Sequence, residues 1–206
     1  MSWIGYRDQW SGIAWVYVDG ALTTTVDTYA TTAQAQAVLY SASGLAPGSH
    51  TLTIEATGTH NSASGASWIW IDAFDVVKRL EQDDPGASYG CPPDVTWYTS
   101  VSSIHSGGSA ALATNPGCQA SLAFTGTAVS WIGYQDGWSG IADVLIDGAS
   151  RGEIDTYAAS AGPQSRIYTL SGLTPGSHTL TIQVTGRRNP ASGGAWVWVD
   201  AFEVRP

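Results

Sequence analysis

Residues 131–148 read WIGYQDGWSGIADVLIDG, and residues 3–20 read WIGYRDQWSGIAWVYVDG. Apolar and polar residues alternate through GIADVLI with the period of two that is typical of a half-buried β-strand. The Asp-Gly pair that ends each stretch favours a two-residue hairpin turn. Each stretch therefore predicts a strand that leads into a hairpin, with a tryptophan-containing loop in front of it.

The two stretches belong to a longer internal repeat. Trp3 recurs as Trp131, an offset of 131 − 3 = 128 residues, and the offset stays constant through the repeat. Between residues 2–76 and 130–204, 45 of the 75 aligned positions are identical, with no insertion or deletion. Shared composition does not explain identity at this level, so we expect both copies to have the same fold.

Further strands follow at roughly ten-residue spacing. The segments EIDTY, RIYTL, HTLTIQV and AWVWVDAFEV are separated by turn sequences such as LTPGS and RRNPASGG. Residues 81–129 add more strand candidates, so the second copy has about eight strands, the number in a jelly roll. We predict an all-β fold, an antiparallel jelly-roll β-sandwich, with a partial repeat in residues 1–79 and a complete module in residues 80–206.

The first copy has no counterpart of residues 81–129. A half-sandwich of about 79 residues leaves strand edges unpaired, which promotes association in water. Three arrangements would complete it: upstream residues of a longer parent protein, a second chain, or a middle segment shared by both copies. Strand exchange that produces a homo-oligomer is one form of the second arrangement.

The composition limits the classes of partner. The 206 residues include 8 Lys and Arg against 17 Asp and Glu, which gives a net charge of −9. Such a chain has no basic surface to neutralise phosphates, so we expect no nucleic-acid partner. No apolar run approaches the roughly 18 residues of a membrane span, so we expect no membrane insertion. No leader precedes the first predicted strand, and we expect that it has been removed or that the chain is a fragment.

The two cysteines, Cys91 and Cys118, both lie in the segment that only the second copy has. Pro92-Pro93 and Asn115-Pro116-Gly117 place both residues beside turns. In an acidic, Gly-rich, all-β chain this pattern predicts one disulfide in an exported protein. The alternative is a pair of buried free thiols.

The motifs VSWIGYQDGWSGIADVLIDG, IDTY, LTPGSHTLTIQVTG and AWVWVDAFEV resemble galactose-binding-like β-sandwich modules of secreted bacterial glycoside hydrolases and surface proteins. The resemblance covers residues 81–204 in full and residues 2–76 as the C-terminal part of such a module. It implies carbohydrate binding without catalysis, and an extracellular or cell-surface location.

The resemblance also implies a structural calcium ion, bound by an early acidic residue and by an aspartate on the last strand. The matching positions are Glu81, Asp83 and Asp200. The first copy has Asp72 at the last-strand position but no early acidic partner. Calcium takes about six to eight oxygen ligands, and the run EQDD at residues 81–84 supplies carboxylates. The alternative for such a run is a solvated surface.

Sugar binding requires an exposed aromatic ring beside polar groups, because the C–H face of a pyranose packs on the ring while its hydroxyls form hydrogen bonds. Trp10 and Trp138 fit best, since each lies in a loop of the form YxDxWSG. The predicted ligand-binding residues are Trp10, Trp138, Asp8, Asp136, Tyr29, Tyr157, Asn61, Asn189 and Arg188.

Packing is the alternative role for each of these aromatic residues, because Trp is largely buried on average. Trp10 and Trp138 are therefore also candidates for loop anchors, and Trp3 and Trp131 are predicted to lie in the core. The sequence leaves open whether the tryptophans of the last strand face solvent or core: Trp68 and Trp70 in the first copy, Trp196 and Trp198 in the second.

The search for catalytic motifs favours no enzyme. Residues 148–152, GASRG, match G-x-S-x-G, but they follow a predicted hairpin turn in an all-β context. His50 and His178 begin matching strands, which favours structural hydrogen bonding over base catalysis. Two functions remain: polysaccharide binding by tandem modules, or a structural or adhesive surface module that assembles through strand or aromatic-face contacts.

Overall fold

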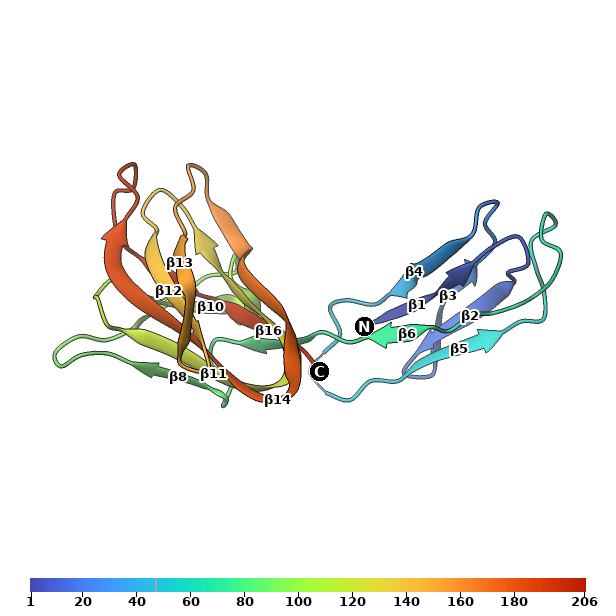
Figure 1. The fold of residues 1–206 in the computed structure, drawn as a ribbon, viewed down its shortest axis with the longest axis horizontal. Coiled ribbons are helices and arrows are strands. Elements are labelled where there is room, and N and C mark those ends of the chain that lie inside the picture. Colours follow the sequence, from blue (N-terminus) through green and yellow to red (C-terminus); the bar gives the residue numbers. More distant parts are fainter. Residues whose placement is uncertain (47) are drawn as a thin grey trace. The chain divides into compact units, whose positions relative to one another are not determined.

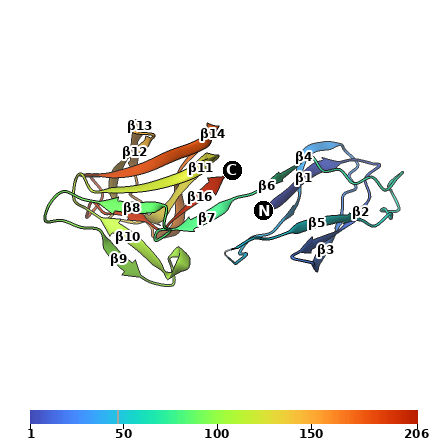
Figure 2. The same cartoon turned by 90° about the horizontal axis from the view of Figure 1, so that it is seen from below.

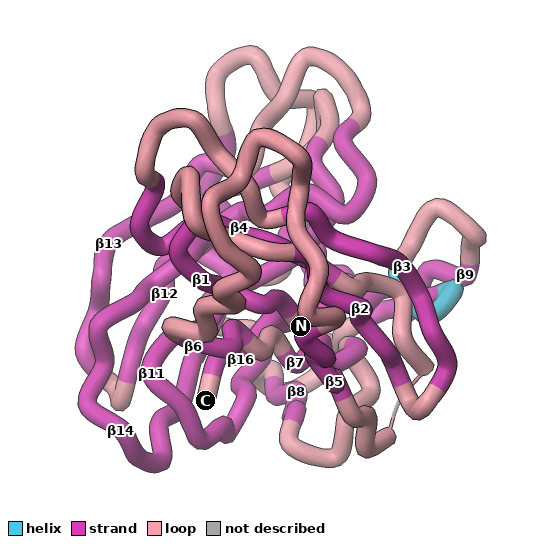
Figure 3. The backbone as a smooth tube through the Cα atoms, turned by 90° about the vertical axis from the view of Figure 1, so that its right-hand side faces the viewer, coloured by secondary structure: helices cyan, strands magenta, loops and turns pink. Residues whose placement is uncertain are grey.

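The computed structural model describes residues 1–46 and 48–206. Strands and loops make up nearly all of the chain, with one short 3-10 helix, η1 (Ser106–Gly108), among the described residues (Figure 3). The described residues include no helix with the length and apolarity that a membrane span needs. The chain divides into two compact units, Met1–Val76 and Val77–Pro206. The boundary after residue 79 stays a prediction.

The first unit contains two three-stranded antiparallel sheets (Figure 1). Their strand orders are β4-β1-β6 and β3-β2-β5. The small core between them has Trp3, Ala14 and Val16 at its centre. The strands are β1 (Ser2–Arg7), β2 (Ile13–Val18), β3 (Ala21–Asp27), β4 (Gln34–Ser41), β5 (Leu52–Ala56) and β6 (Ala73–Asp75).

The second unit contains a seven-stranded sheet and a three-stranded sheet, β15-β10-β9 (Figure 2). The larger sheet has the order β13-β12-β14-β11-β16-β7, and β8 pairs with β11. The strands are β7 (Lys78–Glu81), β8 (Ala87–Gly90), β9 (Tyr98–Val101), β10 (Ser109–Ala113), β11 (Gln119–Gln135), β12 (Gly140–Ile146), β13 (Ala149–Asp155), β14 (Gly162–Arg188), β15 (Val197–Val199) and β16 (Ala201–Arg205).

Strict alternation of burial builds the core of the second unit. In β12 every second residue is buried, and Ala142, Val144 and Ile146 are fully inaccessible to solvent. Val197 and Val199 of β15 enter the same core from the smaller sheet. The predicted fold class is confirmed: an all-β antiparallel sandwich with one complete and one incomplete copy.

Trp3 and Trp131 occupy the same position in the two units, and both are fully buried as predicted. Trp131 donates a hydrogen bond from Nε1 to the backbone carbonyl of Trp198 at 2.9 Å. Trp3 donates the equivalent bond to the carbonyl of Trp70 at 3.0 Å. Each indole therefore attaches the last strand to the strand at the start of the repeat.

The Asp-Gly hairpins form as predicted, with φ of 52° at Asp147 and 77° at Gly148. Positive φ at both central residues is characteristic of a type I′ turn, which matches the twist of the flanking strands. The Asp147 carboxylate then accepts hydrogen bonds from Nδ1 of His178 at 2.7 Å and from the backbone N–H of Thr179 at 2.8 Å. Asp19 accepts the same pair of bonds from His50 and Thr51 in the first unit.

Both ring nitrogens of His178 face oxygen acceptors, since Nε2 lies 2.8 Å from the carbonyl of Thr174. Only the protonated imidazolium donates to both acceptors at once. The Thr174 carbonyl and then Asp147 raise the pKa of His178, and the His178 contact lowers the pKa of Asp147. These histidines thus have the structural role expected from the sequence.

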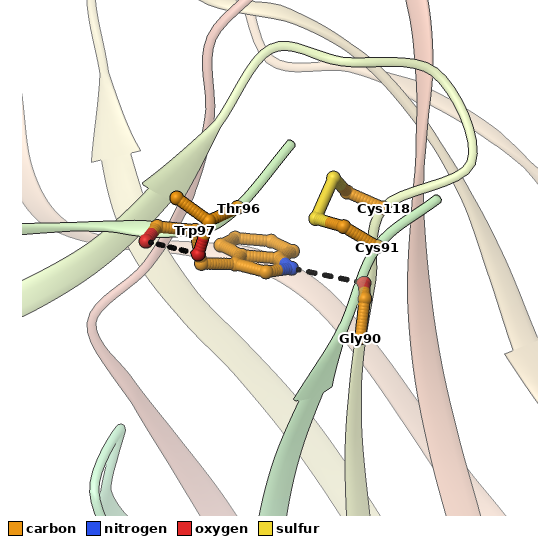
Figure 4. Close-up of a disulfide and its surroundings, with 5 residues drawn as sticks. All are labelled: Gly90, Cys91, Thr96, Trp97 and Cys118. Carbon is orange, nitrogen blue, oxygen red and sulfur yellow. Dashed lines mark hydrogen bonds between the residues drawn. A yellow bond between two sulfur atoms is a disulfide. The ribbon is translucent and has the colours of Figure 1, made fainter. Parts of the chain in front are cut away.

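A disulfide joins Cys91 to Cys118, as predicted (Figure 4). Cys118 is buried in the core, and the bridge closes a segment with a sequence separation of 27 residues. The ring of Trp97 lies beside the bridge and donates a hydrogen bond to the carbonyl of Gly90 at 3.4 Å. The bridge therefore ties the end of β8 to the residue that precedes β11.

Replacing both histidines that contact the hairpin aspartates, His50→Gln and His178→Gln, should lower the melting temperature in a pH-dependent way. The histidine pKa values are raised above 6.5, so their stabilisation is complete below that pH and is lost as pH rises through the folded-state value. The aspartate pKa values are lowered below 3.8, so their stabilisation is lost only as pH falls through that lower value.

Thermal unfolding of wild type and variant between pH 4 and 9 tests this, with the variant deficit expected to be largest between about pH 4 and 6.5. His60→Gln is the matched control, because His60 Nδ1 contacts only the neighbouring carbonyl of Asn61. A difference in melting temperature that stays constant, or grows, above pH 7 would contradict stabilisation by the protonated histidines.

Removal of the disulfide by Cys91→Ala with Cys118→Ala should lower the free energy of unfolding of the second unit by about 3 to 4 kcal/mol, because the closed loop restricts the unfolded chain. Urea unfolding with and without a reductant measures the effect. The double variant should be insensitive to the reductant. An unchanged midpoint in the wild type after complete reduction, checked by thiol titration, is the contrary result.

Candidate functional site

The loop that presents Trp138 is held by the carboxylate of Asp136. Oδ1 of Asp136 accepts hydrogen bonds from the backbone N–H of Trp138 at 2.8 Å and from Oγ of Ser139 at 2.9 Å. The Asp136 N–H in turn donates to Oγ of Ser139 at 3.0 Å. The first unit repeats this turn with Asp8 and Ser11. Ligand binding by Asp8 and Asp136 stays a prediction, and in the structure Oδ1 of each fixes its own loop.

The two loop tryptophans are among the most exposed aromatic side chains, with 49% of Trp10 and 60% of Trp138 accessible to solvent. One side of each ring nevertheless lies against a glycine. A Cβ atom built on Gly65 would lie 2.3 Å from the Trp10 ring, and one on Gly193 would lie 2.9 Å from the Trp138 ring. The glycine backbone therefore seats each ring, and the exposed remainder is a platform of the kind on which a sugar ring packs.

Tyr157 and Asn189 lie next to the Trp138 loop. Tyr157 forms a β-bridge with Asp136, and its N–H donates to Oδ1 of Asp155 at 3.0 Å. Asn189 donates from Nδ2 to Oδ2 of Asp155 at 2.6 Å and accepts from the N–H of Ala191 at 2.9 Å. The amide of Asn189 is thus largely used inside the protein.

The first unit reproduces this network with Tyr29, Asn61 and Asp27. The structure therefore brings the predicted tryptophan, aspartate, tyrosine and asparagine of each copy into one loop cluster. It assigns the asparagines mainly to holding the loops. Tyr29 and Tyr157 are each half-buried.

The second unit adds cations to its loop cluster. Arg188 is the last residue of β14, where it is exposed and lies opposite Gly140. Arg187 forms an ion pair with Glu153. The first unit has Thr59 and His60 at the corresponding positions. Ligand binding by Arg188 stays a prediction, and its position in the first unit is taken by His60.

Sequence reasoning missed the glycine seats and the serines that complete the turns. Ser192 shows the same principle: its hydroxyl donates to the carbonyl of Ser139 at 2.9 Å and joins the two loops. The only sequence signal was that Ser11 and Ser64 recur as Ser139 and Ser192. That signal does not tell which loop each serine contacts.

The tryptophans of the last strand differ between the units. Trp196 and Trp198 are half-buried in the second unit. Trp196 makes an edge contact with Tyr98, and Trp198 packs against Tyr134 and His105. In the first unit Trp68 and Trp70 are exposed. In both copies the interleaved residues face the core, Val197 and Val199 in the second unit and Ile69 in the first, so the tryptophans lie on the opposite face, which is partly covered in the second unit and exposed in the first.

Two of the three predicted calcium ligands meet beside η1. The Oε1 atom of Glu81 accepts from Oγ of Ser106 at 2.9 Å, and Oδ1 of Asp200 accepts from the N–H of Ser106 at 2.8 Å. The second oxygens of both carboxylates, Oε2 of Glu81 and Oδ2 of Asp200, are buried without a hydrogen-bond partner. Burial raises the pKa of Asp200.

Nδ1 of His105 lies 3.9 Å from Oδ2 of Asp200, which is too long for a hydrogen bond. Two buried carboxylate oxygens without a hydrogen bond fit a hard cation such as calcium, which would offset the cost of burying their charge. Asp83 differs, because it is exposed and its charge acts on Tyr89. No group of three or more His, Cys, Asp or Glu in the described part of the chain is arranged to hold a metal. Backbone carbonyls or water would have to supply the remaining oxygens.

A separate cleft of about 500 Å³ lies beside β7 and β11 and is lined by residues that include Lys78, Phe124 and His178. Its histidine is already bonded through both ring nitrogens. The tryptophan loops, with their open rings, are therefore the stronger candidate for ligand binding.

No protein-family model matches the chain. The chain is 27% identical over 187 residues to an A type blood alpha-D-galactosamine galactosaminidase of Flavonifractor plautii, a match that covers 83% of this chain and 16% of that protein. It is 36% identical over 66 residues to an A type blood N-acetyl-alpha-D-galactosamine deacetylase of the same organism, with 32% of this chain and 8% of that protein covered. The chain thus spans less than a fifth of either relative.

Among solved structures, the chain is similar to a two-domain esterase (CEX) active on acetylated mannans. The TM-score is 0.50 at 10% sequence identity, over 70% of this chain and 42% of that one. At this identity the similarity shows the fold alone.

Proposed function

We propose that the chain is a non-catalytic carbohydrate-binding protein with galactose-binding-like β-sandwich modules. The observation that carries the proposal is the pair of solvent-exposed indoles, Trp10 and Trp138, each seated on glycine and presented by the same aspartate turn. A fixed aromatic surface binds the C–H face of a sugar ring without the entropy cost of ordering a mobile side chain.

Binding without catalysis is supported by the use of the carboxylates near the platforms. Asp136 and Asp155 accept hydrogen bonds that hold the loops, so they are poorly placed to act as an acid and base pair. The match to a short part of two much longer relatives also suits an accessory module. Two sites in one chain would raise avidity for a repeating or clustered glycan.

The relatives suggest which sugars to test first. By their names, one acts on A type blood alpha-D-galactosamine and the other on A type blood N-acetyl-alpha-D-galactosamine. We therefore infer a terminal galactose or galactosamine glycan as the first ligand class, and an extracellular or cell-surface setting, which the disulfide also supports.

Replacement of either loop tryptophan, Trp10→Ala or Trp138→Ala, should weaken glycan binding by at least about tenfold. This corresponds to a loss of about 1.4 kcal/mol of binding free energy. A glycan array with terminal galactose, galactosamine and neutral polysaccharide arms finds the ligand, and calorimetry measures the loss. Gly193→Ala should weaken binding at the second site without removing the indole, because the new Cβ displaces the ring.

Trp15→Ala is the matched control, since Trp15 is exposed on β2 outside both loops and has no tryptophan counterpart in the second copy. Equal losses in Trp15→Ala and Trp138→Ala would show that the loops are not the site. If the folded chain binds none of the glycans on the array, the proposed function is excluded.

We also propose a structural calcium ion at Glu81 and Asp200. When bound, the cation would neutralise the two buried carboxylate oxygens that have no hydrogen-bond partner and tie β7 to the end of β15 through η1. Asp72 takes the place of Asp200 in the first unit, where it is exposed. We therefore assign the ion to the second unit only.

Calcium at 100 times its dissociation constant should stabilise the second unit by about 2.7 kcal/mol. Calorimetric melting with calcium, with magnesium and with a chelator measures the shift. Asp200→Asn and Glu81→Gln should abolish the calcium-dependent shift, whereas Asp83→Asn, the neighbouring exposed carboxylate, should keep it. An equal shift in Asp200→Asn and in wild type would place any bound calcium elsewhere.

A further inference from the structure

The segment that precedes β6 in the first unit has an open edge where its counterpart in the second unit, β15, is paired. In the second unit β15 pairs with β10, through Ala111 opposite Val199 and Ala113 opposite Val197. Residues 69–71 occupy the position of β15 in the first unit, and they belong to no strand pair among the described residues. Their backbone N–H and C=O groups therefore present a sheet edge.

The next strand shows the same difference. In the second unit β16 pairs with β7 on its outer side, and Phe202 lies opposite Leu80. The counterpart β6 pairs with β1 alone within the described chain. As a result Phe202 is fully buried, whereas its counterpart Phe74 is 51% exposed.

A third edge lies on the other sheet. The second half of β14 pairs with residues 119–126 of β11 on one side and with β12 on the other. Its counterpart β5 pairs with β2 alone in the part of the chain that the structure describes. Leu180 and Ile182 are fully buried, but their counterparts Leu52 and Ile54 are only partly buried.

We call the surface formed by residues 52–56 and 69–74 the acceptor face. Its apolar residues are those of a core: Ile71 is 53% exposed where its counterpart Val199 is fully buried. In the second unit a single segment, residues 78–125, covers all three corresponding edges. The second unit thus shows which kind of polypeptide fits this face.

Exchange of that segment between two copies of the chain would not complete the assembly. Residues 1–206 contain two such faces and one segment 78–125, so every exchange between copies of residues 1–206 opens as many faces as it covers. The occupant must therefore be an additional segment, and its chemistry is that of residues 78–125: short β-strands with apolar residues on alternate positions.

We propose that the first unit is a strand acceptor, which binds a β-strand-forming polypeptide segment of this kind along its acceptor face. Main-chain hydrogen bonds would extend both sheets, and apolar side chains of the donor would cover Ile71, Phe74, Leu52 and Ile54. This proposal is independent of glycan binding, because Trp10 and its Gly65 seat lie outside the acceptor face.

A chain in which a copy of residues 78–129 directly precedes Ser2 tests whether the face accepts this segment. The junction reproduces the natural step from Val129 to Ser130. Hydrogen exchange followed by mass spectrometry should show amides of residues 69–71 exchanging at least about tenfold more slowly than in the 206-residue chain. Unchanged exchange would overturn the proposal, because the face would then not accept even its own type of segment.

The second arm tests docking without a covalent link. A donor of residues 78–125, with its Cys91–Cys118 bridge closed and fused to a soluble carrier, is added to the intact chain. The same amides should become protected, and Phe74→Lys should abolish the effect. Leu22→Lys is the matched control, because Leu22 is an exposed apolar residue of β3 outside the acceptor face.

Three results of this arm contradict the proposal. The first is protection in the chimera but none with the added donor, which would restrict completion to a covalently linked segment. The second is equal binding by the Phe74→Lys and Leu22→Lys variants, which would indicate non-specific adhesion. The third is concentration-dependent protection of the intact chain without donor, which would identify a second copy as the occupant.

Discussion

The buried indole of the first repeat strand is the contact on which both units depend. Trp131 donates to the carbonyl of Trp198, and Trp3 donates to that of Trp70. Gly133 and Gly5 allow this close approach, since a Cβ at either position would lie 2.4 Å from the same carbonyl oxygen. An unpaired indole N–H in the core would cost about 1 to 3 kcal/mol, so the bond fixes where the last strand passes.

The position of the last strand in turn places the candidate site. Ser139 forms a bridge with Trp196, and Gly140 donates its N–H to the Trp196 carbonyl at 2.8 Å, so the start of the last strand is joined to the Trp138 loop. The loops then use nearly all of their short polar side chains on one another. What they leave open is the aromatic ring. The arrangement favours recognition by ring stacking, supplemented by a few peripheral donors such as Arg188, over recognition by a dense hydrogen-bond network.

Most strand segments, the Asp-Gly hairpins, the disulfide and the core role of Trp3 and Trp131 could be predicted, because alternation and turn chemistry are local properties of the sequence. The turn predicted at LTPGS was wrong for the second unit, where residues 173–177 lie inside β14 and only the register with β11 shifts. The role of Asp136 could not, since a carboxylate in a loop is equally suited to a ligand and to the N–H two residues ahead. The Gly65 seat under Trp10 joins residues 55 positions apart, which no local pattern reports. Asp83 and Glu81 have similar sequence surroundings, and only the fold separates the buried carboxylate from the exposed one.

The burial of the repeat is decided by what covers it, as the two copies show. Phe74 and Phe202 occupy equivalent positions in segments that share 45 of 75 residues, yet one is half exposed and the other fully buried. The strands of the first unit still form, because the pairs β1–β4, β1–β6 and β2–β5 and the Trp3 contact are internal to the repeat. Local pairing therefore sets the backbone of a module, and the segment at residues 78–125 sets which of its faces becomes a core. A module that has this local pairing but lacks the covering segment keeps its tryptophan loop intact and presents an apolar sheet edge. Ligand binding and strand acceptance are therefore separable properties of the same fold.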